Sequence, residues 1–173
     1  MSKVVIIGGG AAGMFASIAA AECGHQVEVY EKNEKLGKKL FITGKGRCNI
    51  TNACDMEGLF DAVRTNVKFL YSSFYGYTNE QVIEFFERIG VPTKVERGDR
   101  VFPVSDHSSD VICGLEREMN RLGVKVHLRT AVKKVVEKEG HFEKIVLGDD
   151  TEVYADACIV ATGGLSYQST GST

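Results

Sequence analysis

Three glycines near the start of the chain have the spacing that lets a polypeptide bind a diphosphate. They are Gly8, Gly10 and Gly13, and they follow the apolar run at residues 4–7. Gly8 suits a tight turn, Gly10 removes the Cβ that would block a phosphate, and Gly13 lets a helix pack on the preceding strand. Because the first N–H groups of that helix have no partner within it, they attract negative charge. The pattern predicts a dinucleotide site.

An acidic residue follows where a ribose ligand is expected. Residues 26–30 have the pattern of a second strand, and that strand ends at Glu31. A carboxylate at this position can accept hydrogen bonds from the hydroxyls of an adenosine ribose, and it repels a 2′-phosphate. The site therefore favours a dinucleotide other than NADP. The alternative is a chance pairing of a glycine-rich turn with a surface glutamate.

These residues need a parallel sheet with a helix beside it to position them. The run at 4–7 is typical of a strand buried on both faces, and a helix is predicted from about Ala11 to Gly24. Residues 31–55 are expected to form a long loop or broken segment. Further helices are predicted at 56–64, 66–75, 79–89 and 109–122, and further strands at 93–96, 100–103, 124–128, 131–138, 141–147, 152–154 and 157–160. The strands from 131 to 154 alternate in the manner of an antiparallel meander, so the fold class is α/β.

Composition excludes several classes of protein. The chain of 173 residues is 43% hydrophobic and 25% charged, with a net charge of −2, which argues against disorder, a membrane span and a nucleic-acid surface. Five cysteines without CxxC spacing suit a reducing compartment, so we expect a cytoplasmic protein. The alternative to five unpaired cysteines is that Cys48 and Cys54 form a redox pair. The four histidines lack metal-ligand companions, so no metal site is expected.

The opening strand–helix–strand unit, the later meander and the closing Ala-Thr-Gly-Gly together resemble the FAD-binding domain of glutathione-reductase-like flavoproteins. In that superfamily the last strand returns beside the first, and its Ala-Thr-Gly loop passes the dinucleotide. The corresponding residues here are Ala161, Thr162, Gly163 and Gly164. The resemblance also implies that the strand after Arg129 carries Val132 past the adenine, where the Val132 backbone contacts the base edge.

Three segments narrow the resemblance to the HI0933-like family of bacterial flavoproteins. They are residues 36–52, 100–106 and 163–167. Members of that family are considerably longer, so residues 1–173 resemble the N-terminal part of their FAD-binding domain, without the inserted β-rich domain and the C-terminal segment that completes the flavin site. We expect this part alone to be inactive. Gln168-Ser169 departs from the family pattern, which has a proline nearby.

The glycine-rich loop at 35–47 is a candidate anion cradle. It contains five basic residues and no acidic one, and basic side chains with exposed N–H groups can neutralise a pyrophosphate or a reduced flavin. Arg47 and Asn49 have the fixed donors that orient a planar ring, whereas a single lysine is as readily a solvated surface residue. The expected cofactor contacts are Gly8, Gly10, Ala11, Ala12, Gly13, Glu31, Lys32, Lys38, Lys39, Gly46, Arg47, Cys48, Asn49, Val132, Ala161, Thr162, Gly163 and Gly164.

The resemblance implies an FAD-dependent oxidoreductase that acts on a small molecule. We favour an oxidase of a small amine or amino-acid-like substrate, with oxygen as acceptor, because no second GxGxxG is present here to bind a nicotinamide donor. The alternatives are a reductase of an activated double bond that uses NAD(P)H, a non-catalytic FAD-binding protein and an NAD-dependent dehydrogenase. No nucleic acid or membrane partner is expected. Asp106-His107-Ser108 is no catalytic triad, because adjacent residues do not face one another, and no catalytic residue is assigned.

Overall fold

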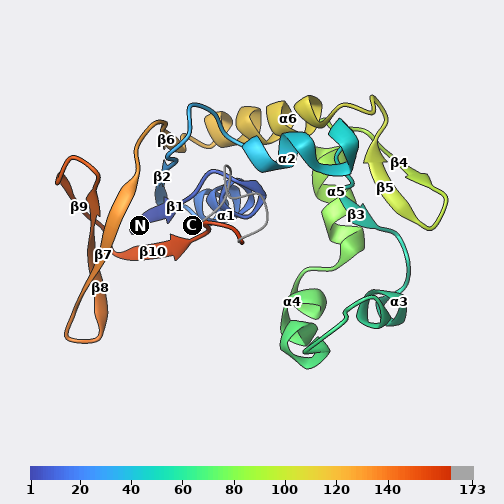
Figure 1. Ribbon diagram of the computed structural model, residues 1–173, viewed down its shortest axis with the longest axis horizontal. Helices are drawn as coiled ribbons and strands as arrows, with labels where there is room; N and C mark the ends of the chain where they lie inside the picture. Colours follow the sequence, from blue (N-terminus) through green and yellow to red (C-terminus); the bar gives the residue numbers. More distant parts are fainter. Residues whose placement is uncertain (165–173) are drawn as a thin grey trace. The chain divides into compact units, whose positions relative to one another are not determined.

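The computed structural model describes residues 1–164, and these residues divide into two compact units (Figure 1). Unit 1 contains residues 1–40 and the chain from residue 115 onward, and unit 2 contains residues 41–114. Each unit is described by itself. In the described residues, no helix is long and apolar enough to cross a membrane.

Unit 1 is built on a parallel sheet of four strands. The strands are β1 (Lys3–Ile7), β2 (Gln26–Tyr30), β6 (Lys125–His127) and β10 (Ala157–Val160), in the order β10-β1-β2-β6. Val4 pairs with Val27 on one side and with Ala157 on the other. The predicted strand–helix–strand unit and the predicted return of the last strand beside the first are both confirmed.

Both faces of this sheet are covered, which explains why β1 is apolar from Val4 to Ile7. Helix α1 (Ala11–Glu22) contacts β1, β2 and β10, and its Met14 and Ile18 are buried. The side chains of Val5 and Ile7 point to the other face of β1 from those of Val4 and Ile6, and they pack with Ile145. Since successive side chains of a strand point to opposite faces, a strand between two layers needs apolar residues at every position.

The second cover of the sheet is the predicted antiparallel meander, drawn in orange in Figure 1. Its strands are β7 (Val132–Lys138), β8 (His141–Leu147) and β9 (Glu152–Tyr154). Ile145 and Leu147 of β8 are buried, whereas Lys133 and Glu137 of β7 are exposed. The alternation therefore separates one face in the core from one face in water, as the sequence predicts.

Unit 2 contains a small antiparallel sheet and several short helices. Its strands β3 (Thr51–Asn52), β4 (Thr93–Glu96) and β5 (Arg100–Pro103) are ordered β3-β5-β4. Its helical elements are η1 (Thr43–Gly46), α3 (Met56–Asp61), η2 (Val67–Leu70), α4 (Tyr71–Gly76) and α5 (Asn79–Arg88), while α2 (Lys38–Ile42) and α6 (Ser108–Arg121) each run from one unit into the other. The segment at 31–55 is thus broken, with short elements inside it.

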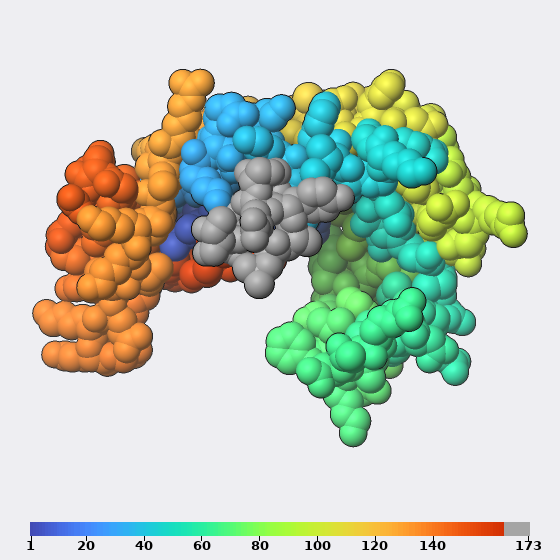
Figure 2. Space-filling model, viewed as in Figure 1, coloured from blue at the N-terminus to red at the C-terminus, as the bar shows by residue number. Residues whose placement is uncertain are grey.

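Two predicted helices are shorter than expected. The helix predicted at 56–64 ends at Asp61, and the one predicted at 66–75 is a 3-10 turn followed by α4. None of α3, η2 and α4 contains a buried residue. Their atoms are among those drawn in teal and green in Figure 2. Because most helical stability in proteins comes from packing of an apolar face, segments without buried residues stay short. In contrast, α5 and α6 have the predicted lengths within one residue and bury Phe85 and Leu115.

Candidate functional site

The glycine turn between β1 and α1 has the geometry that its spacing predicts. Gly8 has a φ of +105°, and a Cβ on it would lie 2.4 Å from the carbonyl oxygen of Ala161. A Cβ on Gly13 would lie 1.8 Å from the carbonyl oxygen of Gly8. Side chains at these two positions would collide with backbone, so the turn and the close packing of α1 both require glycine.

Gly10 differs from these two glycines, because the space beside it is open. A Cβ on Gly10 would meet no heavy atom within 4 Å among the described residues outside its immediate surroundings. Gly10 is the N-cap of α1, no side chain of residues 1–164 caps this end, and the first turn contains no acidic residue. The N–H groups of Ala11, Ala12 and Gly13, which lie in the first turn, therefore form the positive end of a helix beside space that no described residue fills. This arrangement fits a diphosphate.

Glu31 follows β2 and is tied to the glycine turn. Its side chain is buried, with 7% of the residue exposed. Its Oε2 accepts a hydrogen bond of 2.7 Å from the N–H of Gly9, and its Oε1 accepts bonds of 2.8 and 2.6 Å from the backbone and the side-chain amide of Asn33. The carboxylate thus lies next to the turn as predicted, and it also holds that turn in place.

The sequence prediction omits two residues of this site, Gly9 and Asn33. A Cβ on Gly9 would lie 2.2 Å from Cδ2 of Leu36, and the carbonyl oxygen of Gly9 accepts a 2.8 Å bond from the N–H of Gly37. Asn33 donates two hydrogen bonds to the Glu31 carboxylate. Gly9, the middle one of three consecutive glycines, was a usable signal, but the GxGxxG pattern treats that position as variable. A lone asparagine after the strand gives no signal.

The chain after β10 passes the glycine turn. The N–H of Ala161 donates a 2.8 Å bond to Ile7, and both Ala161 and Thr162 lie within contact distance of a Cβ placed on Gly8. Gly163 and Gly164 follow, and no heavy atom comes within 4 Å of a Cβ built on either, among the described residues. The expected approach of this loop to the dinucleotide turn is therefore seen for its first two residues. Leu165-Ser166-Tyr167 and the departure at Gln168-Ser169 lie outside the described residues.

Val132, the predicted adenine contact, begins β7 in the same unit. The segment before it is held against the Glu31 loop, since Arg129 donates to the carbonyl oxygen of Asn33 and Thr130 donates to that of Glu31, both at 2.9 Å. Val132 itself packs on the core of the sheet. Its contact with the adenine stays a prediction.

The three predicted lysines of unit 1 have different surroundings. Lys32 is exposed, and Lys38 and Lys39 are partly buried. Lys38 pairs with Glu34 at 3.5 Å and donates a 3.3 Å bond to Oδ1 of Asn33. The structure thus gives Lys38 two partners within this loop, whereas the sequence predicts a contact with the cofactor.

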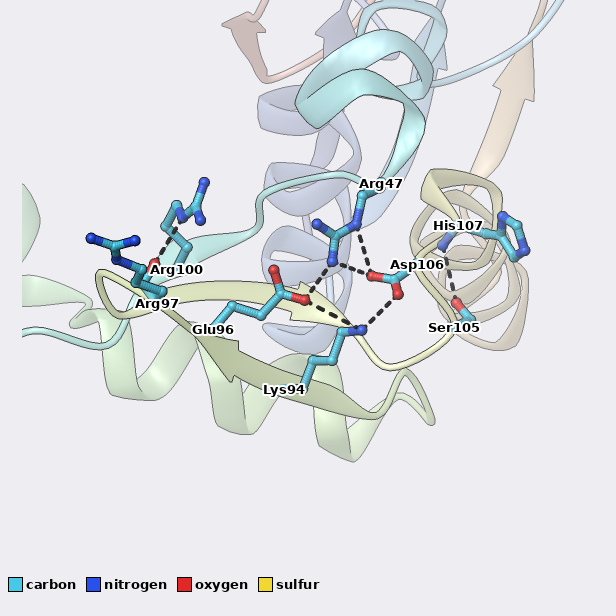
Figure 3. A network of polar contacts seen from close by, with 8 residues as sticks. All are labelled: Arg47, Lys94, Glu96, Arg97, Arg100, Ser105, Asp106 and His107. Carbon is cyan, nitrogen blue, oxygen red and sulfur yellow. Dashed lines mark hydrogen bonds and ion pairs between the residues drawn. The ribbon is translucent and has the colours of Figure 1, made fainter.

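The remaining predicted residues belong to unit 2, where Arg47 joins a network of four charged side chains (Figure 3). Arg47 donates to Asp106 and, at 2.5 Å, to Glu96, while Lys94 donates to Asp106 at 2.6 Å. Hydrogen bonds from Lys94 and Arg47 lower the pKa of Asp106 below its usual value. The guanidinium also lies 4.2 Å from the ring centre of Phe102. Two carboxylates therefore compensate the positive charges of Arg47 and Lys94.

Gly46, Cys48 and Asn49 surround Arg47 in the sequence. Gly46 has a φ of +86°, with open space at its Cβ position among the described residues. Cys48 is buried, and burial raises the pKa of its thiol although a hydrogen bond with Thr43 opposes this rise. The amide of Asn49, in the orientation that satisfies both of its groups, donates to the carbonyl oxygens of Thr51 and Val101. These contacts hold the loop together, and flavin contact by these residues stays a prediction.

The other chemistry considered in the sequence has little support in the structure. Asp106 belongs to the charged network, and Ser108 donates a 2.8 Å bond to the carbonyl oxygen of Phe41, so neither is arranged around His107 as a triad requires. Among residues 1–164, no three histidine, cysteine, aspartate or glutamate side chains are grouped to hold a metal ion.

Comparison with known proteins identifies the family. The model of the HI0933-like protein Rossmann domain matches residues 2–173. The chain belongs to the HI0933-like family. This confirms the resemblance seen in residues 36–52, 100–106 and 163–167, and it confirms the α/β fold.

Curated relatives of this HI0933-like chain have names that describe enzymes. It is 34% identical to the 3-dehydro-bile acid delta(4,6)-reductase of Clostridium scindens, a match that covers 99% of this chain and 41% of the relative. It is 29% identical to the ribosomal RNA dihydrouridine synthase of Haemophilus influenzae, with 99% and 43% covered. The chain thus spans about two fifths of the length of the curated relatives it matches.

A solved structure supports the fold of this HI0933-like chain. THI4 of Thermovibrio ammonificans superposes with a TM-score of 0.66 over 98% of this chain and 60% of THI4, at 16% identity. The family and the fold are consistent with FAD as the cofactor. In unit 1, the first turn of α1, Gly10 and Glu31 lie together at the glycine turn, and their contact with the adenosine diphosphate half of FAD stays a prediction.

Proposed function

We propose that the protein is an FAD-dependent reductase of a carbon–carbon double bond conjugated to a carbonyl group, with NAD(P)H as the electron donor. The observation that carries this proposal is the open helix end at Gly10 with Glu31 beside the same turn, in a chain of the HI0933-like family. The reaction class follows from the names of two relatives. One is a reductase of a delta(4,6) bile acid, and the other makes dihydrouridine, which is uridine with its ring double bond reduced.

In the proposed reaction, NAD(P)H loses a hydride, and the two carbons of the double bond gain one hydride and one proton. FAD, when bound, supplies the hydride carrier between these two steps. The described residues contribute binding and orientation. The N–H groups at the start of α1 hold the diphosphate, Glu31 accepts from the ribose, and Ala161 and Thr162 border the turn.

An oxidase of a small amine, with oxygen as acceptor, is the second candidate. One observation favours it: the GxGxxG pattern occurs once in this chain. These residues therefore contain no second nucleotide turn of this type for a nicotinamide donor. The names of the relatives favour the reductase, because both describe a reduction.

Anaerobic spectroscopy of the purified protein tests the proposal. We expect a yellow protein whose flavin absorbance is bleached by NADH or NADPH and returns on addition of a 3-oxo-4,6-diene steroid or of RNA that contains uridine. Bleaching by a small amine, followed by return of colour only with oxygen, would support the oxidase. Persistent colour with every donor would indicate a binding protein, and a colourless protein that binds NAD stoichiometrically would exclude FAD.

A further inference from the structure

A chain of three hydrogen bonds runs from Lys38 to the glycine turn. Lys38 Nζ donates to Oδ1 of Asn33 at 3.3 Å, Nδ2 of Asn33 donates to Oε1 of Glu31 at 2.6 Å, and the N–H of Gly9 donates to Oε2 of Glu31 at 2.7 Å. All four residues belong to unit 1. Because each group accepts from one neighbour or donates to the next, a change at Asn33 affects the carboxylate beside the nucleotide turn.

Asn33 is itself fixed by its surroundings. Its side-chain oxygen faces the ammonium group of Lys38 and its side-chain nitrogen faces a carboxylate, so the orientation of the amide is determined by both contacts. Its backbone N–H donates to Glu31 at 2.8 Å, and its carbonyl oxygen accepts from Arg129 at 2.9 Å. An asparagine held at four atoms has one conformation before any ligand binds.

These contacts leave the Glu31 carboxylate limited room for a ligand. An ionised carboxylate offers about four acceptor positions. Three are used by the N–H of Gly9 and the two N–H groups of Asn33. The remaining position, on Oε2, can accept a single hydroxyl, and the full negative charge stays beside the glycine turn.

We propose that Asn33 is a positioning residue that fixes Glu31 as the acceptor for one ribose hydroxyl and thereby sets the preference for an adenosine ribose without a 2′-phosphate. Lys38 supports this role by orienting the Asn33 amide. The inference rests on the proposed function only in that an adenosine dinucleotide binds at the glycine turn. In Asn33→Ala, Oε1 of Glu31 loses the side-chain donor and keeps only the backbone N–H of residue 33, so the carboxylate is held less firmly beside the ribose.

Binding of two nucleotides to the apoprotein tests the preference. Calorimetric titration gives the ratio of the dissociation constants of 2′-phospho-ADP and ADP. We expect Asn33→Ala to reduce this ratio about tenfold, because the charge that repels the 2′-phosphate is held less firmly once the side-chain donor is lost. Asn120→Ala, an exposed asparagine of α6, is the matched control and should leave the ratio unchanged.

Asn33→Asp gives a readout that a merely structural residue would not change. It places a carboxyl group against the Glu31 carboxylate, and two carboxylates that share a site raise the pKa of one of them. When protonated, the new carboxyl can donate to Glu31 as the amide does. The terminal phosphate of ADP also titrates at about pH 6, so the variant is compared with the wild type at each pH. We therefore expect the affinity of this variant for ADP, relative to that of the wild type, to fall as the pH rises from about 5 to 7.

The outcomes separate this inference from the proposed function. If Asn33→Ala weakens ADP and 2′-phospho-ADP by the same factor, or changes neither, Asn33 has no part in the preference and the inference fails. If the affinity of Asn33→Asp for ADP, relative to that of the wild type, is the same at pH 5 and 7, the positioning role also fails. A protein that shows the expected nucleotide ratios but reduces no conjugated double bond supports the inference and overturns the proposed function. Absence of binding to both FAD and ADP overturns both.

Discussion

Gly10 and Gly13 lie one turn apart at the start of α1, and their surroundings show two different reasons for a glycine. A Cβ on Gly13 would collide with the backbone of Gly8, so the fold requires that glycine. A Cβ on Gly10 would enter open space among the described residues, and the φ and ψ of Gly10, −81° and −169°, suit any residue. Packing therefore does not explain Gly10, whereas the predicted approach of a phosphate would.

Gly10→Val should separate binding from folding. We expect the affinity for FAD to fall by about tenfold or more, since the side chain occupies the space of the phosphate, while stability falls by about 1 kcal/mol for a poorer N-cap. Flavin fluorescence titration and thermal unfolding measure the two effects. Gly10→Ser is a useful second variant, because serine is a good N-cap and should weaken binding without loss of stability. Unchanged affinity in both variants would exclude the diphosphate from this helix end.

Glu31→Ala should affect both folding and binding, because the carboxylate has structural partners. Its loss leaves the donors on Gly9 and Asn33 without their acceptor, which costs about 1–3 kcal/mol of stability, and we expect flavin binding to weaken by a similar amount. Thermal unfolding and flavin titration are the measurements. Glu34→Ala, an exposed neighbour that pairs with Lys38, is the control and should leave the melting temperature unchanged. If Glu31→Ala retains wild-type flavin affinity, Glu31 is no ribose ligand.

At the scale of elements, helix α5 shows how far local sequence signals reach. Thr78 and Gln81 have capping-box spacing, and in the structure each accepts a hydrogen bond from the backbone of the other. The segment at 66–75 has helical residues but no fully buried side chain within η2 and α4, and it forms two short pieces. Signals carried by neighbouring residues therefore define the start of a helix, while its length depends on what it packs against.

Thr78→Ala should destabilise unit 2 by about 1 kcal/mol, because the N–H of Gln81 loses its acceptor at the start of α5. Urea unfolding monitored by circular dichroism measures the change. Thr78→Ser keeps the hydroxyl and should behave as the wild type. Equal destabilisation in the two variants would show that the methyl group of Thr78, and not the cap, is what matters.

At the scale of the whole molecule, one buried charged residue in the sheet of unit 1 ties stability to pH. Glu28 lies in β2 with 8% of its surface exposed. Burial raises its pKa, but hydrogen bonds from Tyr30 and Lys3 and the charges of Lys3 and His127 outweigh burial, so the pKa of Glu28 lies below its usual value. His127 Nε2 is 3.3 Å from this carboxylate. Ionised Glu28 therefore stabilises the folded state.

Acid unfolding should reveal this contribution. Folding lowers the pKa of Glu28, so its carboxylate stabilises the folded state fully at pH values above the pKa of the unfolded state, which is about 4.3 for glutamate. This stabilisation is lost as the pH falls through the lower pKa of the folded state. We expect the free energy of unfolding to decrease below about pH 4.3, and Glu28→Gln to flatten this decrease. Glu137→Gln, at an exposed position of β7, serves as the control. An identical acid limb in Glu28→Gln and the wild type would contradict the prediction.

The sequence alone determined the parts of this protein that depend on short-range backbone constraints. Gly8 and Gly13 mark a turn that only glycine can form, and the apolar and alternating strands distinguish the covered sheet from the half-exposed meander. Glu31 could be placed beside the glycine turn because parallel strands end at one edge of the sheet. Each of these inferences needs only neighbouring residues and a known fold.

Tertiary structure alone decided which side chains are partners. No spacing indicates that Asn33 bonds to Glu31 and Lys38, or that Gly9 is closed in by Leu36. Arg47, the predicted flavin contact, has its charge shared with Glu96 and Asp106, which are far from it in the sequence. A side chain's charge is visible in the sequence, but the groups that neutralise it come together only when distant segments pack, and that packing decides what the charge can bind.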